Sequence, residues 1–351
     1  MAFVQASHFE LVAEGLGYPE SPKYLPDGSI LLVEIKNHCL SRIGPDGSRE
    51  VVAQLSGGPN GLALGPDGKA WIANNGGFNW ETVPLPNGQV INIGTTQPDN
   101  YEGGHVQRVD MSTGKAETVY RSCTKGLKLG GFGEREPVPV NFPKPLGLRG
   151  PDDLVFDSKG GFWLSDWGKQ REREADVTGI YYASSAGGDI CEAIFPLAAP
   201  NGIALSPAED RLYTALTYAR EIIFWELEGP GKIKPNPATM DGSHLLTAKL
   251  PGQAILDSMS VDEDGNVYVA IMVPEGATPM SNGGIAVVSP DGKSVDFMEI
   301  KLDSRYAPLP SALCFGGKDR KTMYVTCGAS GLLIKCSVHI PGHPLNFNPY
   351  D

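Results

Sequence analysis

Short apolar runs alternate with glycine-containing turns along almost the whole chain. Clear examples, all rich in Val, Ile, Leu, Tyr, Phe or Trp, are 29–34, 69–74, 161–166, 211–216, 266–271 and 322–327. Runs of this length, separated by Asp-Gly or Gly-Gly pairs, are typical of β-strands joined in hairpins. We find no amphipathic helical pattern of useful length. The pattern therefore predicts an all-β protein.

Each of these runs is the second half of a repeated hairpin. The first half opens on a polar residue, usually after proline, as in "PNGLALGPDG" (59–68), "PDDLVFDSKGG" (151–161) and "PNGIALSPAED" (200–210). Further copies are "PESPKYLPDG" (19–28), "LDSMSVDEDG" (256–265) and "PSALCFGGKD" (310–319). A hairpin that recurs every 40 to 55 residues, in units of about four strands, is typical of a β-propeller.

The spacing of the copies predicts six antiparallel four-stranded blades in a single domain, 1–351, with seven blades as the alternative. The long gap between the second and third copies holds an outer hairpin in "HVQRVDMSTGKAETVYRS" (105–122). The remaining excess forms two insertions, at about 76–103 and 123–148, which we expect to be loops that cover one face. The N-terminal "HFELVAE" (8–14) is expected to complete the last blade and close the ring.

The leading polar residues of the six hairpins should form a ring. The first strand of each propeller blade lines the central axis, so equivalent positions lie at the same height. These positions hold Glu20, Asn60, Asp152, Asn201, Asp257 and Ser311. Carboxylate and amide oxygens that converge in this way suit a hard cation such as Ca²⁺, and the lack of Cys or His disfavours zinc. The alternative is that each side chain caps its own turn, which we favour for Asn60 taken alone.

Four motifs in this order resemble the gluconolactonase family, which includes senescence marker protein-30 and luciferin-regenerating enzyme. They are "GYPESPKY", "PDDLVFDSKGGFWLSD", "PNGIALSPAEDRLY" and "LDSMSVDEDGNVYVA". The resemblance implies a six-bladed propeller with one catalytic divalent cation. Calcium is favoured, and magnesium, manganese and zinc are alternatives. The family's metal ligands fall on Glu20, Asp152, Asn201 and Asp257.

One of these ligands departs from the commoner family pattern. Asp152 stands where most members carry Asn, and this likens the chain to the calcium-dependent drug-responsive lactonase branch. The resemblance implies hydrolysis of a lactone, in which the cation polarises the carbonyl and water attacks. Asp257 is the general base that the family places there. We expect Asp153 and Ser258 to lie next to the ligands: Asp153 would orient a neighbouring ligand or turn, with a plain turn residue as the alternative, and Ser258 would donate to the substrate or contact the metal.

Strand direction suggests which residues surround the centre. If the first strand of a blade starts at the metal, the second strand ends on the same face, and the insertions open there too. The substrate-binding candidates are Asn60, Asn74, Trp80, Arg149 and Trp167. Because the insertions would cover the metal, we expect a substrate bulkier than a simple sugar lactone.

Composition narrows the choice of partners and compartment. The net charge of −12 argues against nucleic acid or an anionic membrane as the main partner. The N-terminal residues show no signal-peptide pattern, and no apolar run approaches the ~18 residues of a membrane span. The six cysteines lack CxxC spacing, which favours reduced thiols. We expect a cytoplasmic protein, monomeric or a small homo-oligomer, that acts on a small-molecule lactone or ester.

Two other functions remain open at this point. A condensing enzyme that resembles strictosidine synthase would need no cofactor and would use a single Glu. A binding propeller would use an outer surface and keep calcium only for structure. A serine hydrolase lacks support, because the chain has no Gly-Xaa-Ser-Xaa-Gly motif.

Overall fold

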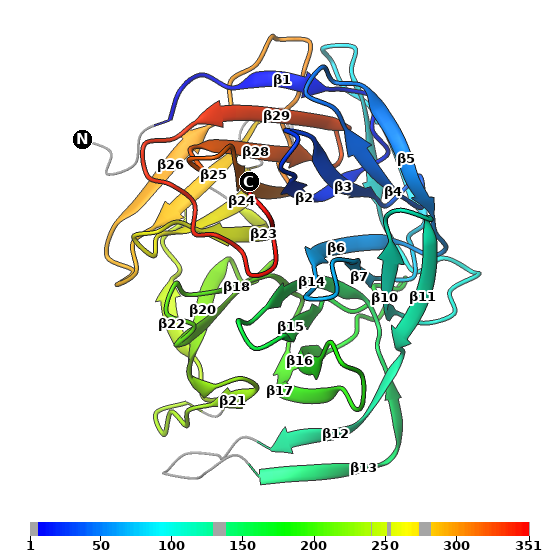
Figure 1. Cartoon of the computed structure of the whole chain (residues 1–351), viewed down its shortest axis with the longest axis vertical. Helices are drawn as coiled ribbons and strands as arrows, with labels where there is room; N and C mark the ends of the chain where they lie inside the picture. The colour runs from blue at the N-terminus through cyan, green and yellow to red at the C-terminus, as the bar shows by residue number, and fades with distance from the viewer. Residues whose placement is uncertain (1–5, 129–137, 240, 251–253, 274–281, 351) are drawn as a thin grey trace.

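The computed structural model describes residues 6–128, 138–239, 241–250, 254–273 and 282–350. All the regular elements formed by these residues are β-strands. The strands form blade-like sheets around a central axis (Figure 1). The all-β prediction is therefore confirmed.

Six sheets make the blades, each with its strands in order from the axis outward. The first blade holds β2 (Pro19–Tyr24), β3 (Ile30–Glu34), β4 (Cys39–Ile43) and β5 (Arg49–Gln54). The second holds β6 (Pro59–Leu64), β7 (Ala70–Asn74), β10 (His105–Asp110) and β11 (Lys115–Tyr120). The third holds β14 (Pro151–Phe156), β15 (Gly161–Asp166), β16 (Thr178–Ser184) and β17 (Cys191–Leu197). The fourth blade holds β18 (Pro200–Leu205), β19 (Arg211–Leu216), β20 (Glu221–Gly229) and β22 (His244–Thr247). The fifth holds β23 (Ile255–Val261), β24 (Val267–Val273), β25 (Asn282–Val288) and β26 (Val295–Glu299). The sixth holds β27 (Ala312–Gly316), β28 (Thr322–Cys327), β29 (Leu332–Ser337) and β1 (Glu10–Ala13). A short strand, β21 (Lys232–Ile233), pairs with the end of β20.

The ring closes as the repeat predicts. The innermost strands contact one another in the order β2, β6, β14, β18, β23 and β27, and β27 contacts β2 again. The sixth blade takes its outer strand from the N-terminal side, because β1 pairs antiparallel with β29, with Leu11 opposite Ile334. Six blades and N-terminal closure are both confirmed.

The hydrophobic core lies between neighbouring blades. Three fully buried tryptophans, Trp71, Trp163 and Trp225, belong to clusters that combine side chains of adjacent sheets. Trp71 of the second blade, for example, packs edge-on against Phe156 of the third, with ring centroids 5.7 Å apart. All six cysteines are free thiols, and five of them are buried.

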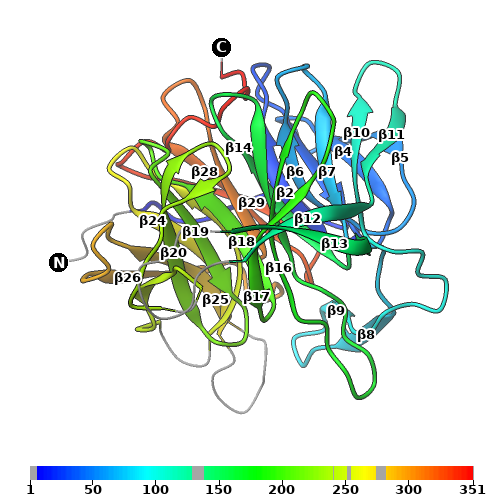
Figure 2. The same cartoon turned by 90° about the horizontal axis from the view of Figure 1, so that it is seen from below.

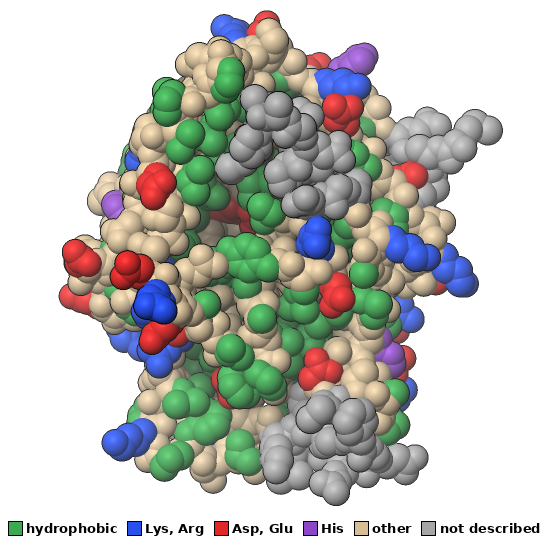
Figure 3. Space-filling model, turned by 180° about the vertical axis from the view of Figure 1, so that it is seen from behind, with side chains coloured by type: hydrophobic (Ala, Val, Ile, Leu, Met, Phe, Trp, Pro, Cys, Tyr) green, Lys and Arg blue, Asp and Glu red, His purple; other side chains and the backbone are tan. Residues whose placement is uncertain are grey.

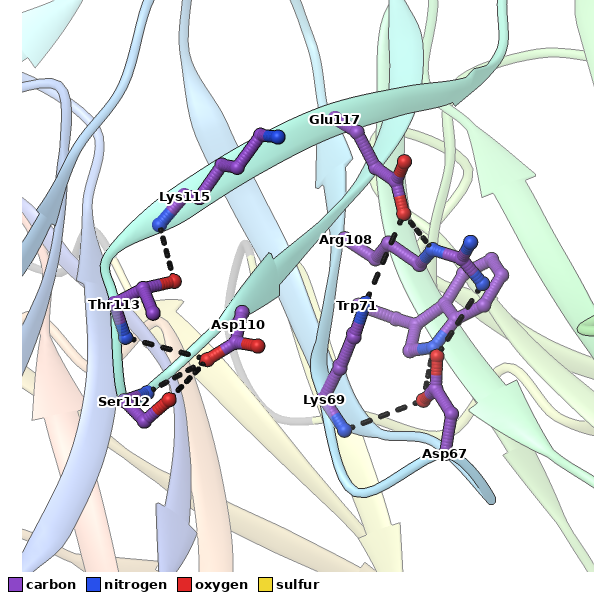
Figure 4. A network of polar contacts seen from close by, with 9 residues as sticks. All are labelled: Asp67, Lys69, Trp71, Arg108, Asp110, Ser112, Thr113, Lys115 and Glu117. Carbon is purple, nitrogen blue, oxygen red and sulfur yellow. Dashed lines mark hydrogen bonds and ion pairs between the residues drawn. The ribbon is translucent and has the colours of Figure 1, made fainter.

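Asp side chains fix the turns that the repeat aligns. In the second blade the Asp67 carboxylate accepts hydrogen bonds from the Lys69 backbone N–H at 3.2 Å and from Trp71 Nε1 at 3.0 Å. Figure 4 shows Arg108 beside the same carboxylate and close to the Trp71 ring. This Asp therefore anchors a hairpin, which explains its fixed place in the repeat.

The two insertions form hairpins rather than loops, and they lie in different places. Segment 76–103 contains β8 (Trp80–Pro84) paired with β9 (Val90–Gly94), on one face of the ring (Figure 2). Segment 123–148 contributes to β12 (Ser122–Lys128) and β13 (Val138–Gly147), which extend the third blade outward through the parallel pair β12–β17. The expectation that 123–148 covers the metal face is therefore wrong for its described residues.

The C-terminal segment 339–350 lies on the face opposite the β8–β9 hairpin and crosses the centre of the ring there (Figures 1 and 2). Its Asn348 side chain donates to the Tyr24 carbonyl at 3.1 Å, and Asn346 donates to the Phe156 carbonyl at 3.0 Å. His343 N donates to the Val261 carbonyl at 2.9 Å. The segment thus ties together blades that are not neighbours. Among the residues described, no helix is long and apolar enough to pass through a lipid bilayer.

Candidate functional site

A cavity of about 280 Å³ opens at the channel mouth on the β8–β9 face. Figure 3 shows this face, hollowed near its centre, with acidic side chains at the bottom and hydrophobic side chains around them. The innermost strands contribute Glu20, Asn60, Asp152, Asn201 and Asp257 to the polar lining, and other segments contribute Asn92, Thr95, Gln170 and Thr217. The apolar lining includes Tyr18, Ile35, Phe78, Trp80, Ile93, Trp167, Tyr218, Ile255, Leu256, Met272 and Ala329. The geometry therefore brings five of the six predicted ring positions into one cavity.

The glycine after each ring asparagine has a packing reason. A Cβ on Gly61 would lie 2.5 Å from the Asp152 carbonyl oxygen, and one on Gly202 would lie 2.8 Å from that of Asp257. Glycine therefore allows each innermost strand to approach the backbone of the next ring residue. The strand pairing is also irregular just after the polar residue, for instance between Pro151 and Leu154. This local irregularity is typical of strands that direct side chains into a site.

The sixth ring position, Ser311, supports Glu20 instead of lining the cavity. Ser311 is buried and its hydroxyl bonds to the Glu20 carboxylate. Its Oγ also lies 3.1 Å from the Pro19 carbonyl oxygen, which is a second acceptor for the single hydroxyl proton. The Ser21 N–H adds a 3.1 Å hydrogen bond to Glu20 Oε2. Both Ser21 and Tyr18 have positive φ, 45° and 58°, so the backbone on either side of this carboxylate is strained.

Burial raises the pKa of all three cavity carboxylates, and the charge of Asp257 raises the pKa of the other two further. Burial raises the pKa of Glu20 well above its usual value, and the charges of Asp257 and Asp152 raise it further. Burial also raises the pKa of Asp152, with Asp257 next in effect. For Asp257, burial raises the pKa to about 7 against a hydrogen bond from Asn201, which lowers it. In such surroundings the carboxylates stay ionised only with a cation nearby, and otherwise they take up protons.

An unpartnered oxygen in the same place supports that requirement. Asn201 is 7% exposed, and its Oδ1 is buried without a hydrogen-bond partner. A buried amide oxygen that lacks a partner is costly, and it is a preferred ligand of hard cations. Among the described residues, no three His, Cys, Asp or Glu side chains already lie close enough to hold a metal ion. The oxygen donors therefore fit a divalent cation in type, while the carboxylates face the cavity without forming a tight cluster.

Asp153 and Ser258 lie on the other side of the ring, as alternation along a strand requires. Both line a smaller cavity of about 60 Å³ further down the channel, together with Lys23. The Ser258 side chain bonds to the Asp153 carboxylate, and Leu154 N donates to Asp153 Oδ1 at 2.8 Å. Burial raises the pKa of Asp153 to about 6, while the Lys23 charge lowers it. Their position behind the ring suits a supporting role.

Two of the substrate-binding candidates lie outside the cavity lining. The Asn74 side chain is fully buried, with Oδ1 accepting from Gly58 N at 2.9 Å and Nδ2 donating to Ser56 O at 2.7 Å. Arg149 is exposed, and its backbone N–H donates to Asp166 Oδ2 at 2.7 Å. We therefore leave Asn74 and Arg149 out of the candidate site. Asp166 fixes the start of β14, because its Oδ1 also accepts from Gly150 N at 2.6 Å.

The other candidates, Asn60, Trp80 and Trp167, do line the cavity. Sequence reasoning missed several of their neighbours, among them Tyr18, Ile35, Gln170, Thr217 and Met272. Tyr18 stands two residues before the candidate ligand Glu20 in "GYPESPKY". This closeness in sequence could have indicated that Tyr18 lines the cavity. Its ring packs on Trp80 with centroids 5.2 Å apart. Ile35 and Met272 carry no signal beyond their place after a strand or near its end.

Solved structures with this architecture come from several organisms. A calcium-binding protein, regucalcin, from Agrobacterium tumefaciens aligns with a TM-score of 0.65 at 15% identity, over 98% of each chain. A gluconolactonase from Xanthomonas campestris aligns with a TM-score of 0.63 at 15% identity, over 97% of this chain and 96% of that one. At such identities the likeness shows the fold alone.

Sequence comparison places the chain more closely. A gluconolactonase from Zymomonas mobilis is 24% identical over 340 residues, which cover 90% of this chain and 78% of the relative. Lactonase drp35 from Staphylococcus aureus is 36% identical over 121 residues, about a third of either chain. The family described as "SMP-30/Gluconolactonase/LRE-like region" matches residues 18–329, which include all four ligand candidates and nearly all of the ring. The chain therefore belongs to the SMP-30/gluconolactonase/LRE-like family.

Proposed function

We propose that this protein hydrolyses a lactone with the help of one divalent cation, for which calcium is the favoured ion. Glu20, Asp152, Asn201 and Asp257 would hold the cation. The observation that carries the proposal is the unpartnered Asn201 Oδ1 in a cavity that it shares with three carboxylates. The relatives named gluconolactonase and lactonase support the reaction, and the calcium-binding protein of the same fold supports the ion.

The residues present can perform the steps of ester hydrolysis. A cation bound there would polarise the lactone carbonyl and stabilise negative charge on its oxygen. A carboxylate oxygen of Asp257 would accept a proton from the water that attacks the carbonyl carbon. The ring C–O bond then breaks, and the proton returns to the leaving oxygen to give a hydroxy acid. The Asn201 amide, which bonds to Asp257, would keep that carboxylate oriented.

The remaining cavity residues favour a substrate larger than a simple sugar lactone. Trp80 and Trp167 contribute large apolar surfaces to a cavity of about 280 Å³. Asn60 is the polar candidate beside them, and its side chain would contact the substrate rather than the cation. Sugar lactones expose hydroxyl groups on every side, and much of this lining offers them no hydrogen bonds.

The test combines metal analysis with a panel of lactones, assayed with and without a chelator. We expect bound calcium in the purified protein, loss of hydrolysis with EDTA, and recovery on adding Ca²⁺. Asp257→Asn should lower kcat by about a hundredfold or more. Asp152→Asn should weaken calcium binding, because it removes a negative charge. Glu299→Gln, which changes an exposed carboxylate of the fifth blade, is the matched control and should leave both properties unchanged.

Two outcomes would contradict the proposal. Activity that resists the chelator would favour a condensing propeller that needs no cofactor. Bound calcium with no lactone hydrolysis, and function unaffected by Asp257→Asn, would favour a binding propeller in which the ion is structural.

A further inference from the structure

A buried lysine lies directly behind the cavity wall, outside the proposed metal centre. Lys169, in the loop after β15, is 1% exposed. Its Nζ donates to the Gly77 carbonyl at 2.6 Å and lies 3.5 Å from Asn75 Oδ1. The Phe78 ring centroid lies 4.0 Å from the same nitrogen, which is a cation–π contact. Lys169 therefore holds the segment that follows β7 through neutral groups.

That segment is held from within as well as by Lys169, because Gly76 N donates to Asn74 Oδ1 at 3.0 Å and Gly77 N donates to Asn75 Oδ1 at 2.8 Å. Gly76 and Gly77 both have positive φ, 79° and 92°, and glycine has the widest backbone freedom of any residue. The start of the segment is fixed by Asn75 N, which donates to the Gly58 carbonyl at 2.8 Å. At the end of the segment, where the chain turns into Phe78, Lys169 binds the Gly77 carbonyl, and just beyond it Asn79 N donates to the Thr96 carbonyl at 2.9 Å.

Phe78 is the centre of an aromatic wall, which we define as Phe78, Trp80 and Trp167. The Phe78 ring lies edge-on to Trp80 with centroids 6.0 Å apart, and edge-on to Trp167 with centroids 6.4 Å apart. All three side chains line the cavity that holds the candidate ligands. Trp167 is itself fixed by a 3.2 Å hydrogen bond from its Nε1 to Thr217 Oγ1. Phe78 has no polar group, so its position depends on its backbone, on Lys169 and on packing against Trp80 and Trp167.

A buried ammonium group has a cost that calls for a reason. Burial lowers the pKa of Lys169 to about 7, although the charges of Asp166, Asp152 and Asp176 raise it. Its neighbour Arg171 makes an ordinary ion pair with Asp176, at 2.9 Å, near the surface. Lys169 differs from Arg171 in being directed inward, toward the wall.

We propose that Lys169 is a positioning residue, which holds the aromatic wall in place to bind an apolar ring carried by the lactone substrate. An aromatic substituent would pack against the wall edge-to-face, as the three rings pack against one another. Ile93, Ile255 and Met272 extend the apolar surface around it. That the substrate is a lactone rests on the proposed function. The aromatic wall and its affinity for an apolar ring do not depend on it.

The experiment compares two lactones that differ only in the ring they carry, γ-phenyl-γ-butyrolactone and γ-butyrolactone. We expect the protein to prefer the phenyl compound by about tenfold or more in kcat/KM. Lys169→Met, which keeps the length and removes the charge, should raise KM for the phenyl compound about tenfold. Because the Lys169 charge also lowers the pKa of Asp152, any change in kcat should be equal for the two lactones, and KM for γ-butyrolactone should change by less than about twofold. Arg171→Met is the matched control on the same loop and should leave the preference intact.

A second variant keeps the test valid if Lys169→Met does not fold. Phe78→Leu removes the ring from a half-buried position and should abolish the same preference. Equal use of both lactones by the wild type would overturn the proposal. So would a Lys169→Met protein that keeps the full phenyl preference, or one whose kcat/KM falls equally on both lactones.

Binding of lactams separates this inference from the proposed function, because lactams resist hydrolysis. In calorimetry, 5-phenylpyrrolidin-2-one should bind the wild type about tenfold more tightly than pyrrolidin-2-one, and Lys169→Met should remove the difference. This result in a protein that hydrolyses neither lactone would support the wall and contradict the lactonase proposal. Hydrolysis with no phenyl preference in either assay would do the reverse.

Discussion

Buried polar side chains in this propeller differ in whether their oxygens have hydrogen-bond partners. Glu34, at the end of β3, is fully buried and accepts hydrogen bonds from Gly17 N at 2.7 Å and Ser41 Oγ at 2.5 Å. Arg49 Nε donates to the same carboxylate, at 2.5 Å from Oε1. Both oxygens of Glu34 are therefore bonded, in contrast to the unpartnered amide oxygen of Asn201.

The pKa of Glu34 gives a prediction with a definite sign. Burial raises this pKa, but the bonds from Ser41, Gly17 and Arg49 outweigh burial, and the pKa lies below that of a free Glu. A lowered folded-state pKa means that the carboxylate adds stability above pH 4.5, and that this stability is lost as pH falls through the folded pKa. Glu34→Gln should therefore cost about 1–3 kcal/mol at pH 7, and the difference should shrink below about pH 4. Urea unfolding across that pH range measures it, and a difference that grows on acidification would contradict this role of the carboxylate.

The ring of polar side chains was predictable at this scale, and the other residues that line the cavity were only partly so. Position in the repeat fixes the height of Glu20 or Asp257 along the axis, because the innermost strands are equivalent. Whether an amide at the end of β7 points into the cavity or into its own turn depends on local bonding, which no repeat encodes. Asn74 bonds to Gly58 and Ser56, and for that reason its prediction as a substrate contact failed.

At the scale of elements, the β8–β9 hairpin joins distant blades over the cavity. It leaves the second blade, yet Ile91 is buried in a cluster with Leu309 and Ala329 of the sixth blade region. Asn92 N donates to the Ala329 carbonyl at 2.9 Å. The hairpin is therefore packed down, and its cavity residues are held by contacts far from their own blade.

Releasing this hairpin should affect the site and spare the fold. Ile91→Ala removes its main buried contact, at a local cost of about 2–5 kcal/mol. We expect faster hydrogen exchange in 80–94 and a higher KM for lactones, with little change in the midpoint of global unfolding. Val90→Ala, at a half-exposed position on the same strand, should change none of these. A matching fall in global stability would show that the hairpin is part of the cooperative core.

The insertions mark the limit of prediction for elements. Their length and composition indicated that they lie outside the blade repeat, which is correct. They did not indicate that 76–103 forms a hairpin over the cavity while 123–148 extends an outer edge. Residues such as Ile91 and Phe142 follow no repeat, so only tertiary packing determines the face on which each hairpin lies.

For the whole molecule, closure by β1 makes the ring a single unit. β29 would be an open edge without its partner, and blades in a ring share their cores with both neighbours. Deleting residues 1–13 should therefore lower the melting temperature by about 5–10 °C, in one cooperative transition. Calorimetry checks this, and an unchanged melting temperature would mean that closure adds no stability. The number of blades followed from the repeated hairpin, and the closure followed from the strand pattern of residues 8–14.

The C-terminal segment affects access to the central channel. It spans the far mouth of the channel, where Asn346 and Asn348 fasten it to the third and first blades. Small molecules would then both enter and leave through the cavity mouth beneath the β8–β9 hairpin. Under the proposed function, the hydroxy acid product would leave past the same aromatic side chains that its parent lactone passed, so product and substrate would compete for one passage.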